Sequence, residues 1–271
     1  MNTKPLLLLF ALFTSLSLEP LAQIADASLD VRKAFLITRP KAAAKPAPKA
    51  RAKPRQRTEN ATAPLGLGYT LYQRDRSGQP VRVDAAQEFH AGDAVRLLLE
   101  FNVEGYLYVF HAENGNAPTM IFPDARLNGG DNWISAHVPY EVPSSRETDP
   151  RFRWFYFDDK AATERLSIIV TRNPLPNVPA GKVLVANCYS GSPNCAWRPT
   201  EAVWNRWAAP TEMLAAVSSR ETFGQALTAL ERDAVTRGLG LPSGAPAPAV
   251  VKMSSSTKAE RLMLTIDLVH K

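Results

Sequence analysis

The sequence predicts a mainly β protein, an antiparallel immunoglobulin-like β-sandwich with a helical insert near its C-terminal end. The first observation is a series of about eight or nine short segments within residues 65–271 in which apolar and polar residues alternate, separated by Gly, Asn, Asp and Pro. The second is a single region of helical periodicity, at about residues 200–238, that interrupts the alternating segments. The length of 271 residues suits one domain with a substantial core.

The first half of this domain predicts strands. Residues 67–75 predict a strand, residues 94–101 carry apolar side chains at every second position, and residues 119–122 predict a shorter strand. Residues 105–110, Gly-Tyr-Leu-Tyr-Val-Phe, are apolar on both faces, which predicts a central strand covered above and below. The alternative interpretation is that these aromatic side chains line a groove for a carbohydrate or a peptide.

The second half continues with strands and contains the insert. Further strands are predicted, in order, at residues 133–140, 151–159, 164–176, 181–188 and 259–271. The last strand carries four apolar residues on one face: Leu262, Leu264, Ile266 and Leu268.

Two helices are predicted within the insert. Ser218 followed by Glu221 forms a capping-box pattern, which predicts the start of a helix that ends at Gly238. Residues 201–210 predict a shorter helix, and the Pro-rich residues 240–249 predict a flexible loop.

The N-terminus has the pattern of a secretory signal peptide. Lys4 precedes an apolar run at residues 5–18, and Ala25 and Ala27 offer small residues at a cleavage site, so residues 1–27 are predicted to be the signal. The alternative is an uncleaved membrane anchor, although the run is short for a membrane span. We therefore expect an exported protein, periplasmic or extracellular, that is not an integral membrane protein after cleavage.

Residues 28–64 are predicted to be a disordered linker rich in Ala, Pro and Lys. Residues 32–57 contain ten basic residues and no acidic one, so they have little apolar surface to bury and their charges repel one another. Residues 58–271 hold 21 basic and 23 acidic residues, so the formal net charge of +6 arises in the linker.

The charge of residues 32–57 suggests a partner. We expect these residues to contact an anionic surface of the cell envelope, such as lipid headgroups or a wall polymer. The alternative is a solvated spacer without a partner. A nucleic-acid partner is not expected, because the chain is predicted to be exported.

The two cysteines, Cys188 and Cys195, predict a local disulfide. An exported chain meets an oxidising compartment, and the short turn-rich segment between the two residues makes closure easy. The alternative is a pair of reduced thiols. The spacing is neither that of a redox pair nor that of a zinc site.

Few residues have the character of a binding site. His111 and Glu113 follow the strand at residues 105–110, at a position where binding residues are often found. They are the first weak candidates for binding.

Three more candidates lie in the glycine-rich segment 123–132: Asp124, Asn128 and Asp131. Their oxygens would suit a weak calcium site, although the spacing is not that of an EF-hand, and a solvated turn explains them equally simply. No catalytic residue, resident metal or cofactor is predicted, because the sequence lacks the HExxH, GxSxG, P-loop and GxGxxG motifs.

A set of short motifs resembles a known family. The Gly92-Asp93 turn, the strand Gly-Tyr-Leu-Tyr at 105–108, the Phe122-Pro123 pair and the later Glu164-Arg165 strand occur here in the order typical of bacterial domain-of-unknown-function family 4384. The similarity covers about residues 68–176. It implies a compact β domain of exported proteins and no catalytic residues.

These observations favour a non-catalytic, exported interaction module of the cell envelope. Its partner would be an envelope protein or glycan, with the basic linker as an electrostatic tether. The alternative is an envelope-polymer hydrolase, or an accessory subunit of one, with His111 and Glu113, or His137, as the acid–base residues. A third option is a spacer that spans the wall.

Overall fold

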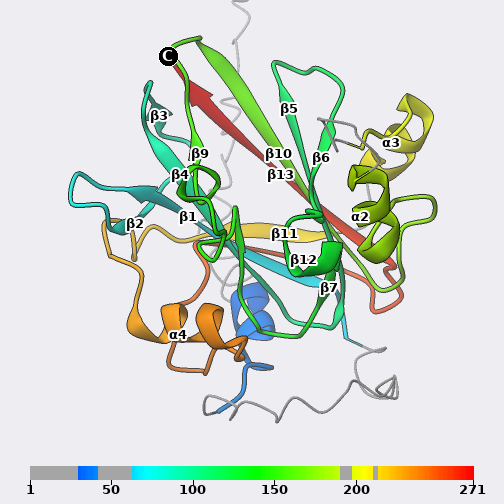
Figure 1. Ribbon diagram of the computed structural model, residues 1–271. Helices are drawn as coiled ribbons and strands as arrows, with labels where there is room; N and C mark the ends of the chain where they lie inside the picture. The colour runs from blue at the N-terminus through cyan, green and yellow to red at the C-terminus, as the bar shows by residue number, and fades with distance from the viewer. Residues whose placement is uncertain (1–29, 42–62, 190–196, 210–212) are drawn as a thin grey trace, which may run out of the picture.

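The computed structural model describes residues 30–41, 63–189, 197–209 and 213–271 (Figure 1). The predicted signal peptide, most of the basic linker and Cys195 lie outside these residues. The described part contains thirteen strands in two sheets, which confirms the mainly β sandwich. Among these residues, no helix is long and apolar enough to cross a membrane.

The first sheet is antiparallel and is built on β1. Its strands are, in spatial order, β11 (Met213–Ser218), β12 (Val250–Ser254), β1 (Gly66–Arg74), β4 (Ala94–Phe101) and β8 (Tyr140–Val142), with β2 (Pro80–Val83) paired to β1 and β9 (Phe155–Tyr156) paired to β4.

The second sheet is built on β10 and β13. Its strands are, in spatial order, β3 (Glu88–Phe89), β13 (Arg261–His270), β10 (Ala162–Thr171), β5 (Gly105–Glu113) and β6 (Thr119–Phe122), with β7 (Trp133–Ile134) paired to β5. All its pairs are antiparallel except β13 with the short β3.

The main core lies between the sheets. It is formed by alternate side chains of β1, β4, β5, β10 and β13, and the four leucine and isoleucine residues predicted on one face of β13 are all buried in it. Each such side chain stabilises the fold by roughly 1.5–3 kcal/mol relative to exposure. The alternation seen in the sequence is therefore the signature of this inter-sheet layer.

A second core covers the outer face of β5. Tyr108 and Phe110 are buried there beneath α2 (Gly181–Tyr189) and α3 (Glu201–Ala208), and the Phe110 ring lies 5.3 Å from that of Trp204, centroid to centroid. Leu107 and Val109 face the main core. The prediction of a central strand covered on both faces is confirmed, and the alternative of an open aromatic groove on this strand is wrong.

Two elements cover the outer face of the first sheet. α4 (Ala229–Arg237) packs Val235 against Tyr72 and Leu98. The helix at residues 30–36 packs Val31 and Phe35, four positions apart on one helix face, against Val251 and Met253.

The ordered N-terminal segment, residues 30–41, corrects the predicted linker. Residues 28–64 were expected to be disordered, but this part of them is folded onto β1, β11 and β12. Its two arginines have structural partners: Arg32 donates to the carbonyl oxygens of Pro248 and Ala249, at 2.6 and 3.2 Å, and Arg39 donates to the Glu100 carboxylate. The prediction of disorder, which was based on the basic composition, was therefore wrong for residues 30–41.

Two glycines of β1 allow the N-terminal segment and the chain that follows α4 to lie close to this strand. A Cβ on Gly66 would lie 2.8 Å from the Phe35 ring, and one on Gly68 would lie 2.5 Å from the Pro248 ring. A side chain at either position would displace the N-terminal segment or the chain that follows α4.

Other predicted elements differ from the structure. Residues 181–188, predicted as a strand, form α2, because a short apolar run fits either element. Residues 151–159 hold only the end of a 3₁₀ turn, η3 (Pro150–Phe152), and the short β9. Residues 133–140 are divided between β7 and the start of β8.

The helical insert was predicted in part. The shorter helix is confirmed as α3, which Thr200 caps. The long helix ends at Gly238, in the left-handed conformation with φ of 64°, as predicted, but its capping box is formed by Thr228 and Glu231. Ser218 ends β11 instead, and neither β11 nor β12 was predicted.

Candidate functional site

A groove of about 620 Å³ opens at the edge of the sandwich. It lies between β6 and β8, which are the end strands of the two sheets, and the loops that follow them. We call it the edge groove. Its walls are mainly apolar and aromatic, with Met120, Phe122, Phe152, Trp154 and Phe155 among them, and its acidic residues are Asp124, Glu141 and Glu147.

The loop after β6 forms one wall. The Asp124 carboxylate accepts a hydrogen bond from the Arg126 backbone nitrogen at 2.9 Å, which closes a turn, and also pairs with the Arg126 guanidinium. That guanidinium lies 4.4 Å from the centroid of the Phe152 ring. The loop is thereby joined to the opposite wall by a cation–π contact.

The segment after β8 forms the other wall. Glu141 accepts from the Ser145 backbone nitrogen at 2.9 Å and from Arg96 at 3.4 Å. The buried Arg96 guanidinium lies 4.0 Å from the centroid of the Trp154 ring and donates to the Arg153 carbonyl. Burial lowers the pKa of Arg96, and the nearby Glu141 carboxylate opposes that shift.

Glu147 is the unusual residue of the groove. It is only 6% exposed, and its Oε1 atom accepts from the Thr148 backbone nitrogen and hydroxyl, at 2.8 and 3.0 Å. Its Oε2 atom is shielded from solvent and has no hydrogen-bond partner among the described residues. Such an atom costs free energy in the folded state. The edge groove therefore holds one buried carboxylate oxygen whose acceptor capacity is unused.

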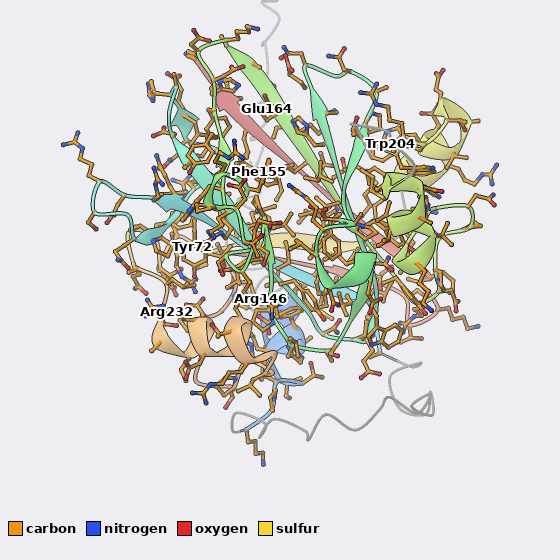
Figure 2. All side chains as sticks on the ribbon, in the orientation of Figure 1. Tyr72, Arg146, Phe155, Glu164, Trp204 and Arg232 are labelled. Carbon is orange, nitrogen blue, oxygen red and sulfur yellow. The ribbon has the colours of Figure 1, made fainter. Side chains whose placement is uncertain are left out.

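The candidates at the end of β5 do not join this groove. His111 Nε2 forms a short contact with Glu164 of β10, not with Glu113. The other Glu164 carboxylate oxygen lies 3.4 Å from Nε2 of the buried His270. Neither His111 nor Glu164 is among the residues that line the groove; Figure 2 labels Glu164 and the wall residue Phe155.

The candidates in segment 123–132 are separated in the same way. Asp124 lines the groove, whereas Asn128 begins the turn η2 (Asn128–Gly130). Asp131 accepts from the Trp133 backbone nitrogen at 3.1 Å. In the part of the chain that the structure describes, no group of three His, Cys, Asp or Glu side chains is arranged to hold a metal ion.

Comparison with known protein families gave a match to the region that contains most of the groove. Residues 88–174 match the model of the family described as Domain of unknown function (DUF4384). The chain carries a DUF4384 domain. The match confirms the family resemblance, although it begins later than the expected residue 68. No curated protein and no solved structure gave a match.

The DUF4384 domain supplies nearly all of the groove. Only Leu184 and Cys188, both on α2, line it from outside residues 88–174. The remaining lining residues come from β6, β8, β9 and the connections between them.

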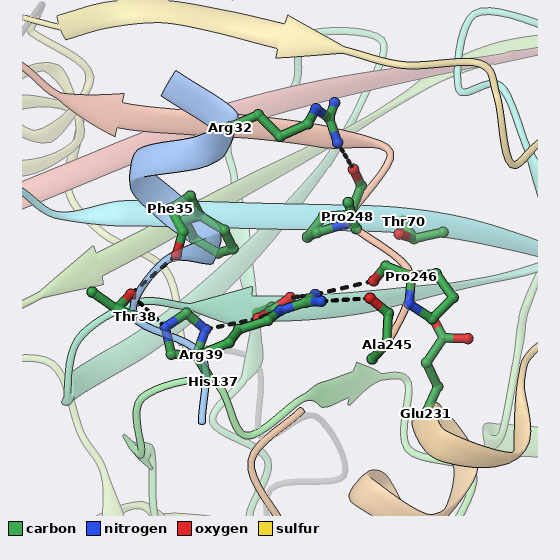
Figure 3. A network of polar contacts seen from close by, with 12 residues as sticks. Arg32, Phe35, Thr38, Arg39, Thr70, His137, Glu231, Ala245, Pro246 and Pro248 are labelled. Atoms are coloured by element: carbon green, nitrogen blue, oxygen red, sulfur yellow. Dashed lines mark hydrogen bonds and ion pairs between the residues drawn. The ribbon is translucent and has the colours of Figure 1, made fainter. Parts of the chain in front are cut away.

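His137 of the DUF4384 domain lies in a buried network of hydrogen bonds. Its Nδ1 lies 2.7 Å from Glu100 Oε1 and its Nε2 lies 2.7 Å from Thr38 Oγ1 (Figure 3). Arg39 binds the same Glu100 carboxylate through two nitrogens, at 2.6 and 2.7 Å, and donates to the Ala245 carbonyl. Glu100 and His137 are each only 2% exposed. This buried network joins the N-terminal segment, the DUF4384 domain and the chain after α4.

The sequence did not reveal the central groove residues. Glu147 stands in an ordinary polar stretch, and Phe152 and Trp154 were assigned to a long strand. The local signal that was present is the concentration of aromatic residues at 152–157 beside Arg151 and Arg153. That pattern is typical of cation–π contacts as well as of strands.

Proposed function

We propose that this protein is an exported, non-catalytic binding module of the cell envelope, with the edge groove as its ligand site. The observation that carries the proposal is the buried Glu147 oxygen without a partner in a groove with aromatic walls. Concave sites of a few hundred Å³ with apolar walls and a few polar groups are the usual form of a binding site.

Export is part of the proposal. It is supported by the signal-like residues 1–27, and it implies a disulfide between Cys188, at the end of α2, and Cys195. Mass spectrometry of the secreted chain, before and after reduction, should show the loss of two hydrogens in the oxidised form. Two thiols that react with a labelling reagent without prior reduction would contradict it.

The proposal also gives a role to residues 42–62, which we call the basic segment. Pro40 accepts a hydrogen bond from Ser243, and the Ala63 carbonyl accepts one from Arg172, so residues 42–62 connect two points of one folded body. We propose that the basic residues among them contact an anionic envelope surface.

Co-sedimentation with isolated envelope fractions tests both parts. The chain from residue 28 is compared at low and high salt with a variant lacking residues 42–57, which keeps the folded residues 30–41, and with Phe152→Ala. Salt-sensitive binding lost with the deletion supports the electrostatic role. Salt-resistant binding lost with Phe152→Ala supports the groove. Binding unaffected by both changes, or no binding at all, would overturn the proposal.

One observation favours a second candidate, the envelope-polymer hydrolase. His111 is partly exposed and pairs with a carboxylate, that of Glu164. His137, the other acid–base candidate, is buried in the network with Glu100. Release of soluble fragments from envelope polymer that stops with His111→Ala would establish the hydrolase. Equal release by that variant would reject it.

A further inference from the structure

We infer that the edge groove binds a lysine or arginine side chain of an extended polypeptide, with Glu147 as its ionic partner. The inference rests on the proposed binding function and names the ligand class for the same site. It follows from the charges of the groove, the chemistry of its walls and the strands that border it.

The charges leave one carboxylate uncompensated. The charged lining residues are Asp124, Arg126, Glu141 and Glu147. Asp124 pairs with Arg126, and Glu141 pairs with Arg96. No Lys or Arg side chain of the described residues pairs with the Glu147 carboxylate, although Arg153 lies near enough to donate to the Glu147 carbonyl at 2.6 Å. A ligand that enters the groove with a positive charge therefore compensates both the negative charge and the unused acceptor.

The walls fit the rest of such a side chain. Lysine and arginine carry an apolar stem and a charged head, so they pack well where rings stand beside a carboxylate. The rings already accept cations: Arg96 lies over Trp154 and Arg126 over Phe152, with 4.0 and 4.4 Å from guanidinium carbon to ring centroid. Phe152 is 45% exposed and is available at the rim. A neutral glycan would pack against the aromatic rings but would leave the charge of Glu147 without a counter-ion.

The borders of the groove favour an extended peptide. β6 and β8 are the outermost strands of their sheets, paired with β5 and β4 respectively. The Met120 nitrogen of β6 already donates to the Trp197 carbonyl at 2.8 Å, so β8 is the strand offered to an added segment. Edge strands are surfaces to which an extended segment adds, with side chains at alternate positions entering adjacent pockets. A volume of about 620 Å³ admits a long side chain together with its flanking residues.

The test measures fluorescence anisotropy of two labelled peptides with the chain from residue 28. One peptide is a capped hexapeptide of Ala and Val with a single central lysine, and the other carries norleucine in place of lysine. The protein variants are Glu147→Gln, Phe152→Ala and the control Glu221→Gln, which removes one exposed carboxylate outside the groove. Thermal unfolding of each variant verifies that it is folded.

The expected result is binding of the lysine peptide that weakens about tenfold or more with Glu147→Gln, falls with Phe152→Ala and is unchanged with Glu221→Gln. The norleucine peptide should bind at least about tenfold more weakly than the lysine peptide to the unmodified chain and lose nothing further with Glu147→Gln.

Two outcomes overturn the inference. One is equal binding of the two peptides, and the other is lysine-peptide binding that Glu147→Gln leaves unchanged. If the lysine peptide fails but soluble envelope glycans bind and Phe152→Ala abolishes that binding, the cationic ligand is rejected while the proposed function stands. If Phe152→Ala changes no binding of any kind, both are rejected.

Discussion

At the scale of single residues, the Glu100 carboxylate lies at the centre of a buried polar network. Its carboxylate binds the Arg39 guanidinium through two hydrogen bonds and also contacts His137, in surroundings closed to solvent. Glu100→Gln leaves the buried guanidinium without its counter-ion, and removal of one partner of a buried pair costs about 3–5 kcal/mol. Urea unfolding of the variant should show a loss of that size.

A matched control for Glu100 is available on the surface. Arg165 and Asp267 pair across β10 and β13 at 2.7 Å, and both side chains are exposed. Asp267→Asn should reduce the free energy of unfolding by less than about 1 kcal/mol. Equal losses in the two variants would show that Glu100 is not held in a low-dielectric site.

Two buried tyrosines of β1 should make the stability of the folded protein decrease at alkaline pH. Burial raises the pKa of Tyr69 to about 12, with a smaller contribution from Asp84, and burial also raises the pKa of Tyr72, with Glu231 adding to the shift. An unfolded tyrosine ionises near pH ~10, so the unfolded state gains a charge that the folded state resists. The stabilisation is complete below about pH 10 and is lost as the pH rises toward about 12.

Stability measured at several alkaline pH values, with tyrosinate absorbance, checks this expectation. Tyr72→Phe should be less stable by about 1 kcal/mol at neutral pH, because the hydroxyl donates to Glu231 at 2.8 Å. It should also lose less stability with rising pH than the unmodified chain. An identical pH profile for the two proteins would reject the assignment to Tyr72.

The sequence could not predict the residues that matter most in the groove and in the network. Asp124 was found because acids in a glycine-rich segment are recognisable locally. Glu100 is buried against Arg39, a residue distant along the chain, and Glu147 is buried within a polar stretch. Nothing in the sequence around either residue distinguishes it from a solvated glutamate. Burial of a polar residue is a property of the tertiary contacts and not of the local pattern.

At the scale of elements, Phe35 packs the N-terminal segment onto the first sheet. This side chain is fully buried against β12, and its ring fills the space left by Gly66. Phe35→Ala creates a cavity and should lower the free energy of unfolding by about 3–5 kcal/mol. Thermal or urea unfolding provides the measurement.

The neighbouring Ile37 serves as the control, because it is 74% exposed. Ile37→Ala should change the stability by no more than about 0.5 kcal/mol. A comparable small effect of Phe35→Ala would mean that residues 30–41 do not fold with the sandwich in solution.

Elements with strong alternation were predicted well and short apolar runs were not. β13 alternates over its whole length, and β5 is apolar on both faces, so each pattern fits one structure only. α2 contains the run Val-Leu-Val, which favours a strand locally. In the structure this run is helical, and its Leu184 is part of the second core. β12 follows a Pro-rich stretch that predicted a loop, and its pairing with β1 is a contact between distant segments.

At the scale of the whole molecule, the count of strands was enough to predict a two-sheet sandwich, but not the order of the strands. β10 lies between β5 and β13, and β1 lies between β4 and β12, so the pairings join parts of the chain far apart in sequence. The same long-range organisation changes how the basic segment is connected to the fold. It was predicted to be a tether that leads to the domain, whereas folded residues lie on both sides of it.

This arrangement predicts the behaviour of the cleaved chain. Trypsin cuts after Lys and Arg, and the basic segment offers such bonds at Lys49, Arg51, Arg55 and Arg57. Residues 28–49 should then remain bound to the rest of the protein through Phe35 and the Arg39–Glu100 pair. Gel filtration of the cleaved protein should give one peak that contains both pieces, and denaturing electrophoresis should separate them.

The Glu100→Gln variant supplies the decisive comparison for that experiment. Without the carboxylate, the Arg39 guanidinium is buried without an ionic partner, and the N-terminal piece keeps the apolar contact of its helix and its hydrogen bonds to backbone carbonyls. The piece should dissociate from cleaved Glu100→Gln and stay on cleaved Asp267→Asn, whose exposed pair lies on the second sheet. Dissociation from the unmodified protein after cleavage would show that the buried network does not hold the N-terminal segment, and the basic segment would then act as a simple tether.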